Sequence, residues 1–167
     1  MDGLEHCLFR VADGIHADQR LIDRIAERQI IVCPTLGILP GSVSAEMMAR
    51  APMGRALEAF AAVLDRMHHA GVRRVAGTDA GIFPGKPHDV QPYCIRALAD
   101  AGLSNGEALG AATSVAANAC SVADRKGVLT VGRDADIVAV GGNPLADLAA
   151  LHDVRAVFRA GVRVSSS

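Results

Sequence analysis

The feature that most constrains the fold is a regular alternation of short apolar runs with helical sequence along the first three quarters of the chain. The run IIVCPTL at 30–36 is almost continuously apolar and is closed by Pro34, as is typical of a strand buried in a parallel sheet. MDGLEHC at the N-terminus has the pattern of the end of an earlier strand, and VRRVAGT at 72–78 that of a third. Strands alternating with helices at these lengths form right-handed βαβ units. We therefore predict an α/β fold with a parallel sheet.

Helical sequence separates and follows these strands. The predicted helices are 16–29, 45–70 with an interruption near Pro52, 92–101 and 104–119. In the first helix, one apolar face is formed by Leu21, Ile22, Ile25 and Ala26. In the last helix, Ser104 and Glu107 form an S-x-x-E pattern, which predicts a capping box at its start.

The sequence pattern changes from helical to β-rich at Lys126. GVLTVGRDADIVAVGGNP and DVRAVFRAGVRV alternate short β-rich runs with Gly-Arg-Asp and Ala-Gly turns. Such patterns are typical of antiparallel strands. We predict that residues 1–125 form the α/β part and that residues 126–167 form a separate small β-layer.

Composition limits the function classes. The net charge is −1 and only 3% of residues are aromatic, so there is no basic surface for nucleic acid or for a membrane. No apolar stretch approaches a membrane span, and the N-terminus lacks the pattern of a signal peptide. The four cysteines are far apart and form no C-x-x-C pair, which favours reduced thiols over disulfides. We expect a soluble cytoplasmic protein.

Two polar residues lie where predicted strands end. His6 follows the first strand and Asp79 follows the third, and parallel strands bring their carboxyl ends to the same edge of a sheet. A charge at the mouth of a buried strand needs a partner or a metal. His6 and Asp79 could share a divalent metal, and Asp79 could act as a general base. The alternatives are that His6 is a packing histidine and that Asp79 caps the following segment.

A third candidate, His88, lies in the loop just after Asp79, where contact with a substrate is plausible. The remaining histidines are better explained by a helix C-terminus or by solvent exposure: His16, His68, His69 and His152. The cysteines have apolar neighbours and no basic partner, so they are poor candidates for a nucleophile. Of these, only the thiol of Cys7, beside His6, merits a test.

Taken together, these segments resemble a known family. In order along the chain they are GLEHC, VCPTLG, AGVRRVAGTDAGI, PGKPH, GLSNGEALGAATSVAANAC, KGVLTVGRDADIVAVGGNPLADL and VRAVFRAGVRV. They are similar to the C-terminal half of the metal-dependent amidohydrolases, in the imidazolonepropionase-like and prolidase-like branch. The resemblance runs over essentially the whole chain, and the ordered series is far more specific than any single piece.

The resemblance implies a partial (β/α)₈ TIM barrel, with strands six to eight and their helices in residues 1–125 and strands of a β-sandwich in residues 126–167. It implies hydrolysis of carbon–nitrogen bonds in a small amide, lactam or dipeptide-like substrate by metal-activated water, with zinc as the expected divalent metal. By the same resemblance, His6 and Asp79 are metal ligands, Asp79 is also the catalytic proton carrier, and His88 is a substrate-side residue.

The chain also departs from the family pattern. An H-x-H pair, a lysine and a further histidine on earlier barrel strands have no counterpart, Cys7 follows His6 where Gly or Ser is usual, and PHD replaces PHG. A closed barrel needs at least about 200 residues. We therefore expect a truncated product, a sequence with a mis-called start, or a fragment, inactive alone. The alternative is a non-catalytic interaction module, or a half-enzyme completed as a homo-oligomer or by a separate N-terminal half.

Overall fold

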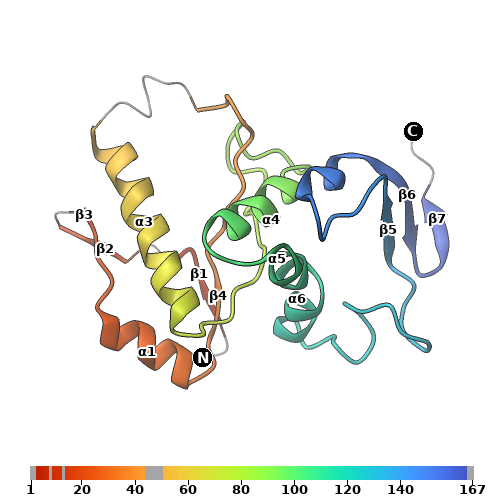
Figure 1. The fold of residues 1–167 in the computed structure, drawn as a ribbon, viewed down its shortest axis with the longest axis horizontal. Helices are drawn as coiled ribbons and strands as arrows, with labels where there is room; N and C mark the ends of the chain where they lie inside the picture. The colour runs from red at the N-terminus through yellow and green to blue at the C-terminus, as the bar shows by residue number, and fades with distance from the viewer. Residues whose placement is uncertain (1–2, 8, 13, 44–50, 165–167) are drawn as a thin grey trace.

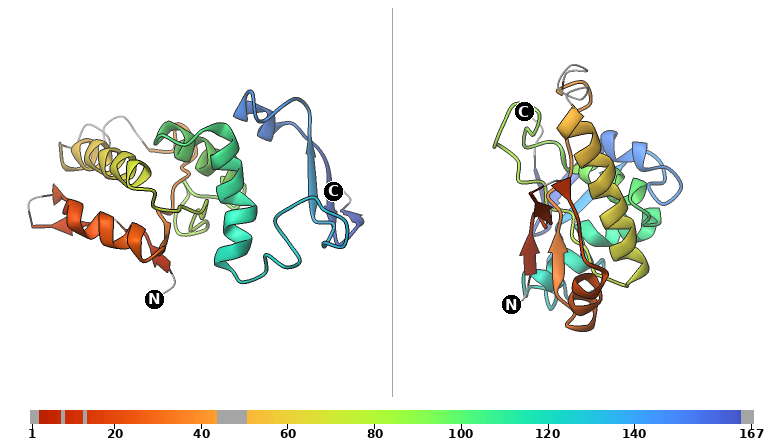
Figure 2. Two further views of the ribbon diagram at one scale, coloured as in Figure 1. Left: turned by 60° about the horizontal axis from the view of Figure 1, so that its bottom comes forward. Right: turned by 90° about the vertical axis from the view of Figure 1, so that its left-hand side faces the viewer.

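The protein has a mixed α/β fold, as expected from the alternating sequence pattern. The computed structural model describes residues 3–7, 9–12, 14–43 and 51–164. Figure 1 shows three groups of elements: an N-terminal part with α1 and α3, a middle group of helices α4 to α6, and a C-terminal sheet of β5 to β7. Figure 2 shows the middle helices lying between the other two groups.

Parallel pairing is confirmed in the N-terminal part. Strand β1 (Gly3–Glu5) pairs in parallel with β4 (Ile31–Cys33), and the two lie side by side in the right-hand view of Figure 2. On the other side of β4, Val32 forms a parallel bridge with Arg74, flanked by two backbone hydrogen bonds of 3.0 Å. The order of the three segments is as expected. The third is a single bridge and not the full strand predicted over 72–78.

Helix α1 (Gln19–Glu27) begins at a capped end, because the Asp18 side chain accepts a hydrogen bond from the Arg20 backbone N–H. Its buried residues are Ile22 and Ile25. Leu21, which was expected on the same buried face, is 43% exposed. The apolar stripe is therefore narrower than the sequence pattern indicated.

Helix α3 (Ala51–His69) is continuous. Pro52 lies in its first turn, where a missing N–H breaks no intrahelical hydrogen bond. The interruption expected near Pro52 stays a prediction, because it depends on the residues directly before Ala51. The start of this predicted helix, residues 45–50, lies outside the described residues.

The helix predicted over 104–119 is two helices. Helix α4 (Gln91–Asp100) precedes them, followed by α5 (Asn105–Ala112) and α6 (Ser114–Ala119). Helices α5 and α6 are separated at Thr113, whose φ of −129° and ψ of −92° are not helical. The capping box is confirmed: the Ser104 side chain accepts from the Glu107 N–H, and the Glu107 carboxylate accepts from the Ser104 N–H.

Two clusters of buried side chains hold these elements together. The first joins α1, β4 and α3, with Ile22, Val32 and Met67 fully buried at its centre. The second joins α4 to α5 around Leu98 and Ala108. Burial of each large aliphatic side chain stabilises the fold by roughly 1.5–3 kcal/mol.

One charged residue is buried beside the first cluster. Arg74 is only 4% exposed, and its Nη1 donates to the carbonyl oxygens of Leu64 at 3.1 Å and Ala101 at 3.2 Å. Ala101 is the C-terminal cap residue of α4, where carbonyls lack intrahelical partners. Burial lowers the pKa of Arg74 to about 10.

The C-terminal β-layer is antiparallel, as predicted. Strands β5 (Ile137–Val140), β6 (Val154–Arg159) and β7 (Val162–Val164) lie in that order, with the 3₁₀ helix η1 (Leu148–His152) between the first two. Regular strand structure begins only at Ile137, later than the β-rich sequence from Lys126 indicated. The division of the chain between residues 125 and 126 stays a prediction.

Two further observations complete the fold. A short hairpin of β2 (Arg10–Val11) and β3 (Gly14–Ile15) was not predicted from the sequence. Among the described residues, no helix is both long enough and apolar enough to cross a membrane.

A candidate active site at the carboxyl ends of three parallel segments

Three polar residues follow the three neighbouring parallel segments. His6 comes directly after β1, Thr35 shortly after β4, and Asp79 after the segment that pairs through Arg74. Because these segments run in parallel, their carboxyl ends lie at one edge, which we call the rim. The rim is where ligands bind in parallel α/β folds.

The backbone at the rim is unusual. His6, Thr35 and Asp79 have φ values of 63°, 50° and 55°. Positive φ is uncommon outside glycine, and for a β-branched residue such as threonine it is a clear outlier. Strained backbone of this kind concentrates at active sites and ligand clamps. Its presence at all three strand ends supports a functional role for this edge.

His6 is held by its neighbour. Its Nδ1 lies 2.9 Å from Thr35 Oγ1, and its backbone N–H donates to the Cys33 carbonyl at 2.8 Å. The residue is exposed, so of the alternative that it is a hydrogen-bonded packing histidine, the hydrogen bond is present and the burial is not. A histidine fixed through one ring nitrogen presents the other to a ligand, so the arrangement fits a metal ligand through Nε2.

Asp79 is also exposed. Solvent therefore hydrates the carboxylate, and the expectation that it needs a partner because it is buried is wrong for the chain as described. The alternative that Asp79 caps the following segment stays open for the loop, but Asp79 does not cap the next helix. The next helix, α4, begins at Gln91 with Val90 at its N-cap position.

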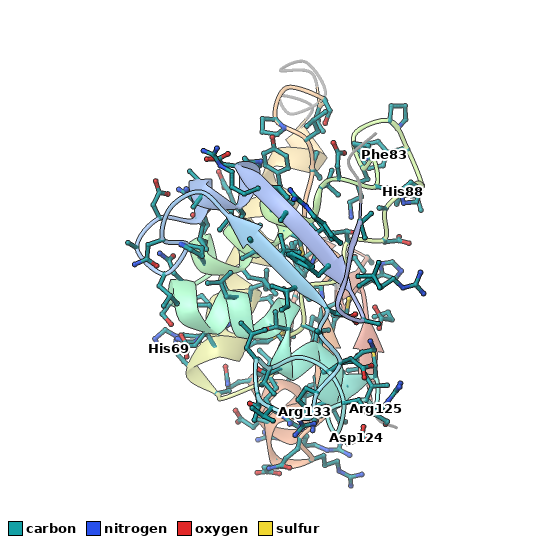
Figure 3. The ribbon with its side chains drawn as sticks, turned by 90° about the vertical axis from the view of Figure 1, so that its right-hand side faces the viewer. His69, Phe83, His88, Asp124, Arg125 and Arg133 are labelled. Carbon is teal, nitrogen blue, oxygen red and sulfur yellow. The ribbon has the colours of Figure 1, made fainter. Side chains whose placement is uncertain are left out.

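His88 lies in the loop between Asp79 and α4. A Cβ built on Gly81 would lie 3.5 Å from both Cε1 and Nε2 of His88, so the imidazole is beside the residue two positions after Asp79. In Figure 3, His88 and Phe83 lie together at one end of the molecule, away from Arg125 and Arg133. This placement is compatible with a loop that overhangs the rim.

Sequence reasoning missed Lys86. This lysine is only 6% exposed, and its Nζ donates to the carbonyl oxygen of Thr35 at 2.5 Å and to that of Thr78 at 2.7 Å. It therefore joins the ends of two of the three segments. Two features of the sequence could have drawn attention to Lys86. The chain contains only two lysines, and this one lies in a loop between Gly85 and Pro87.

The cysteines are free thiols and do not form an activated pair. Burial raises the pKa of Cys7 and of Cys33 to about 11, and that of Cys94 to about 12. A nucleophilic cysteine needs a lowered pKa. This direction supports the interpretation that these three thiols are structural.

The described residues contain no group of three or more His, Cys, Asp and Glu side chains arranged to hold a metal ion. At the rim, the two candidate metal ligands of suitable chemistry are the imidazole nitrogen of His6 and the carboxylate of Asp79. A large apolar cavity of about 600 Å³ lies away from the rim, between α4, α5 and the β-layer, and Ile95, Leu109 and Val138 are among its lining residues.

Comparison with known proteins decides the family. The profile of the amidohydrolase family matches residues 3–164. The chain belongs to the amidohydrolase family. No curated protein matches the sequence significantly.

Solved amidohydrolase structures share the fold. A candidate prolidase from Bifidobacterium longum is 27% identical with a TM-score of 0.80, over 99% of this chain and 42% of that one. An amidohydrolase is 25% identical with a TM-score of 0.77, over 99% and 40%. A Xaa-Pro dipeptidase with methionine bound in its active site is similar in fold, with 23% identity, a TM-score of 0.75, and coverage of 99% and 40%. The chain thus spans about 40% of the length of these amidohydrolase relatives.

Proposed function

We propose that this chain forms the carboxy-terminal part of a metal-dependent hydrolase that cleaves carbon–nitrogen bonds in small amides, cyclic amides or dipeptides. In this proposal, β1, β4 and the segment around Arg74 are the last three strands of a partial (β/α)₈ barrel. One observation carries it: His6 and Asp79 stand exposed at the same edge of parallel segments, on strained backbone. Membership of the amidohydrolase family supports the reaction class.

The proposed roles follow from the chemistry of each group. His6, fixed by Thr35 through Nδ1, would bind a divalent cation through Nε2. The Asp79 carboxylate would contact the same cation, accept a proton from the attacking water and deliver it to the leaving nitrogen. A bound zinc ion would polarise the scissile carbonyl and make water a stronger nucleophile at neutral pH. His88, on the neighbouring loop, would contact the substrate.

Two protein donors make a weak zinc site, because hydrolytic zinc sites generally use three or more protein ligands. We propose that the chain alone binds a divalent cation weakly and turns over little or no substrate. The remaining ligands would come from barrel strands outside this sequence.

The test is a titration of the isotope-labelled chain with paramagnetic Mn²⁺, read by two-dimensional NMR. The expected result is selective broadening of signals near His6 and Asp79, lost in His6→Ala and in Asp79→Asn. His69→Ala serves as the control, since His69 is exposed and lies at the far end of α3. Broadening that is unchanged in the two rim variants would contradict the proposed metal site.

Activity is measured separately, with zinc present, on a panel of simple amides, lactams and dipeptides. Robust hydrolysis that disappears with a chelator would contradict the proposal that the chain is inactive alone. It would nevertheless support the reaction class, and Asp79→Asn should then abolish it.

One observation favours a second candidate, a half-enzyme completed by a second copy. Within the described residues, β1 pairs only with β4, so the outer side of β1 is an open edge. The outer side of the segment around Arg74 is partly covered, because the Ala76 N–H donates to the Ala111 carbonyl at 3.0 Å. Light scattering after size exclusion tests this. A discrete dimer supports completion by a second copy, and a well-behaved monomer contradicts it.

A further inference from the structure

The loop after Asp79 folds back on itself and carries Lys86 toward the strands. The backbone N–H of Gly81 donates to the Lys86 carbonyl at 2.7 Å, and the Lys86 N–H donates to the Phe83 carbonyl at 2.9 Å. A third bond joins the loop to the segment after β4, from the Leu39 N–H to the Gly85 carbonyl at 2.9 Å. The loop is therefore closed, and its lysine side chain points inward.

Burial of an ammonium group is unfavourable unless hydrogen bonds replace the lost water. The Lys86 side chain has two such bonds, to Thr35 and Thr78, and no ion pair with a carboxylate in the described part of the chain. A lysine used only for packing would keep its ammonium group in water. The buried position therefore indicates that the two carbonyl contacts are the reason for this side chain.

The two carbonyls belong to residues that matter at the rim. Thr35 holds the imidazole of His6 through its hydroxyl, and Thr78 directly precedes Asp79. The Lys86 ammonium thus links the group that holds one candidate ligand to the peptide unit that carries the other. It also anchors the loop on which His88 lies.

We propose that Lys86 is a positioning residue that fixes the distance between the His6–Thr35 pair and Asp79 and holds the His88 loop over the rim. The purpose of this positioning rests on the proposed function. The positioning itself is a property of the chain and is measurable without metal or substrate.

A chemical test uses the fact that the chain has only two lysines. Lys126 is the internal control, since its side chain is 35% exposed and pairs with Asp134 and Asp136. The native chain is treated with an amine-acetylating reagent, and each lysine is followed by peptide mass spectrometry. Lys86 is expected to react at least about tenfold more slowly than Lys126, because reaction requires local opening. The difference should vanish in denaturant, and equal native rates would overturn the proposal.

A variant test separates positioning from general support. Lys86→Met keeps the length of the side chain but removes its charge and both hydrogen bonds. Hydrogen exchange is followed in Lys86→Met, in Lys126→Met, and in Arg74→Met, which removes a different buried cation. We expect Lys86→Met to accelerate exchange about tenfold or more at residues 35–37 and 78–89 and not elsewhere, since these amides depend on local opening. Arg74→Met should accelerate exchange throughout the protein, and Lys126→Met should leave the two segments unchanged.

Three outcomes decide the proposal. Faster exchange confined to the two rim segments supports it. Unchanged exchange there, or an equal acceleration throughout the protein as expected for Arg74→Met, overturns it.

The Mn²⁺ titration provides an independent measurement. If the wild type binds at the rim, Lys86→Met should weaken binding by about tenfold, as for loss of a group that orients a metal ligand, with no such change in Arg74→Met. Unchanged affinity would overturn the link between Lys86 and the ligands. If the wild type does not bind, the proposed function fails, and the exchange data alone decide whether Lys86 positions the rim.

Discussion

His6 Nδ1 and Thr35 Oγ1 lie 2.9 Å apart, so a side-chain hydrogen bond joins the ends of two adjacent parallel segments. Replacing Thr35 with valine keeps the branched shape and removes only the hydroxyl. Because groups that orient a ligating histidine are typically worth about 10–100-fold in metal affinity, we expect Thr35→Val to weaken Mn²⁺ binding at the rim by about that factor. Paramagnetic broadening measures it, and Thr35→Ser should retain most of the affinity.

The left-handed backbone at Asp79 predicts an unusual response to glycine. With φ at 55°, alanine at this position is strained, whereas glycine is not. We expect Asp79→Gly to be more stable than Asp79→Ala by about 1 kcal/mol in urea unfolding.

Asp89 provides the matched control, because it is exposed in the same loop but does not have positive φ. There, glycine should be less stable than alanine, since glycine loses more backbone entropy on folding. The same order at both positions would contradict the assignment of strain to Asp79.

The placement of the rim could be predicted from the sequence to a useful extent. Apolar runs located the strands, and the polar residues directly after them, His6 and Asp79, followed from the rule that parallel strands end at one edge. Their roles stay predictions. The positive φ values could not be predicted, since they are uncommon outside glycine and, at the β-branched Thr35, oppose the local preference.

Other features were missed for a related reason. The Lys86 contact to Thr35 joins residues 51 positions apart, so it depends on tertiary structure that no local pattern encodes. The break at Thr113 has no glycine or proline to mark it. There, the Thr113 hydroxyl donates to the Leu109 carbonyl at 2.8 Å, a bond that tends to bend helices.

Stability should fall in alkaline solution. Burial raises the pKa of Cys7, Cys33 and Cys94 above the ordinary value of 9.0, to about 11, 11 and 12. Above pH 9 the unfolded chain loses these protons while the native protein keeps them, so the free energy of unfolding decreases as pH rises toward 11.

Urea midpoints at pH 7 to 10 measure this dependence. Cys94→Ala should lower stability at pH 7 but flatten the decline above pH 9, whereas Cys120→Ala, at an exposed position, serves as the control. A decline in Cys94→Ala as steep as that of the wild type would contradict a role for this thiol.

Two glycines test the packing between α6 and the β-layer. Gly127 and Gly132 both have positive φ, at 88° and 87°. A Cβ on Gly127 would lie 2.7 Å from Ala117 Cβ and 2.8 Å from the Thr113 carbonyl oxygen, whereas one on Gly132 would meet nothing within 4 Å. Because the backbone strain is common to both, we expect Gly127→Ala to be less stable than Gly132→Ala by about 1–3 kcal/mol. Thermal unfolding of the pair measures the difference, and equal losses would contradict this packing.

The pairing register has a consequence for the order of folding. In the β-layer, Arg159 pairs with Val162 across a tight hairpin, whereas Gly3 pairs with Ile31, and Val32 with Arg74. Local contacts form quickly, and distant ones must wait for long loops to close. We expect the C-terminal hairpin to form early and the rim to be assembled last, because it needs three segments from residues 3 to 79. The candidate active site at the rim is then the part of the structure that forms last during folding.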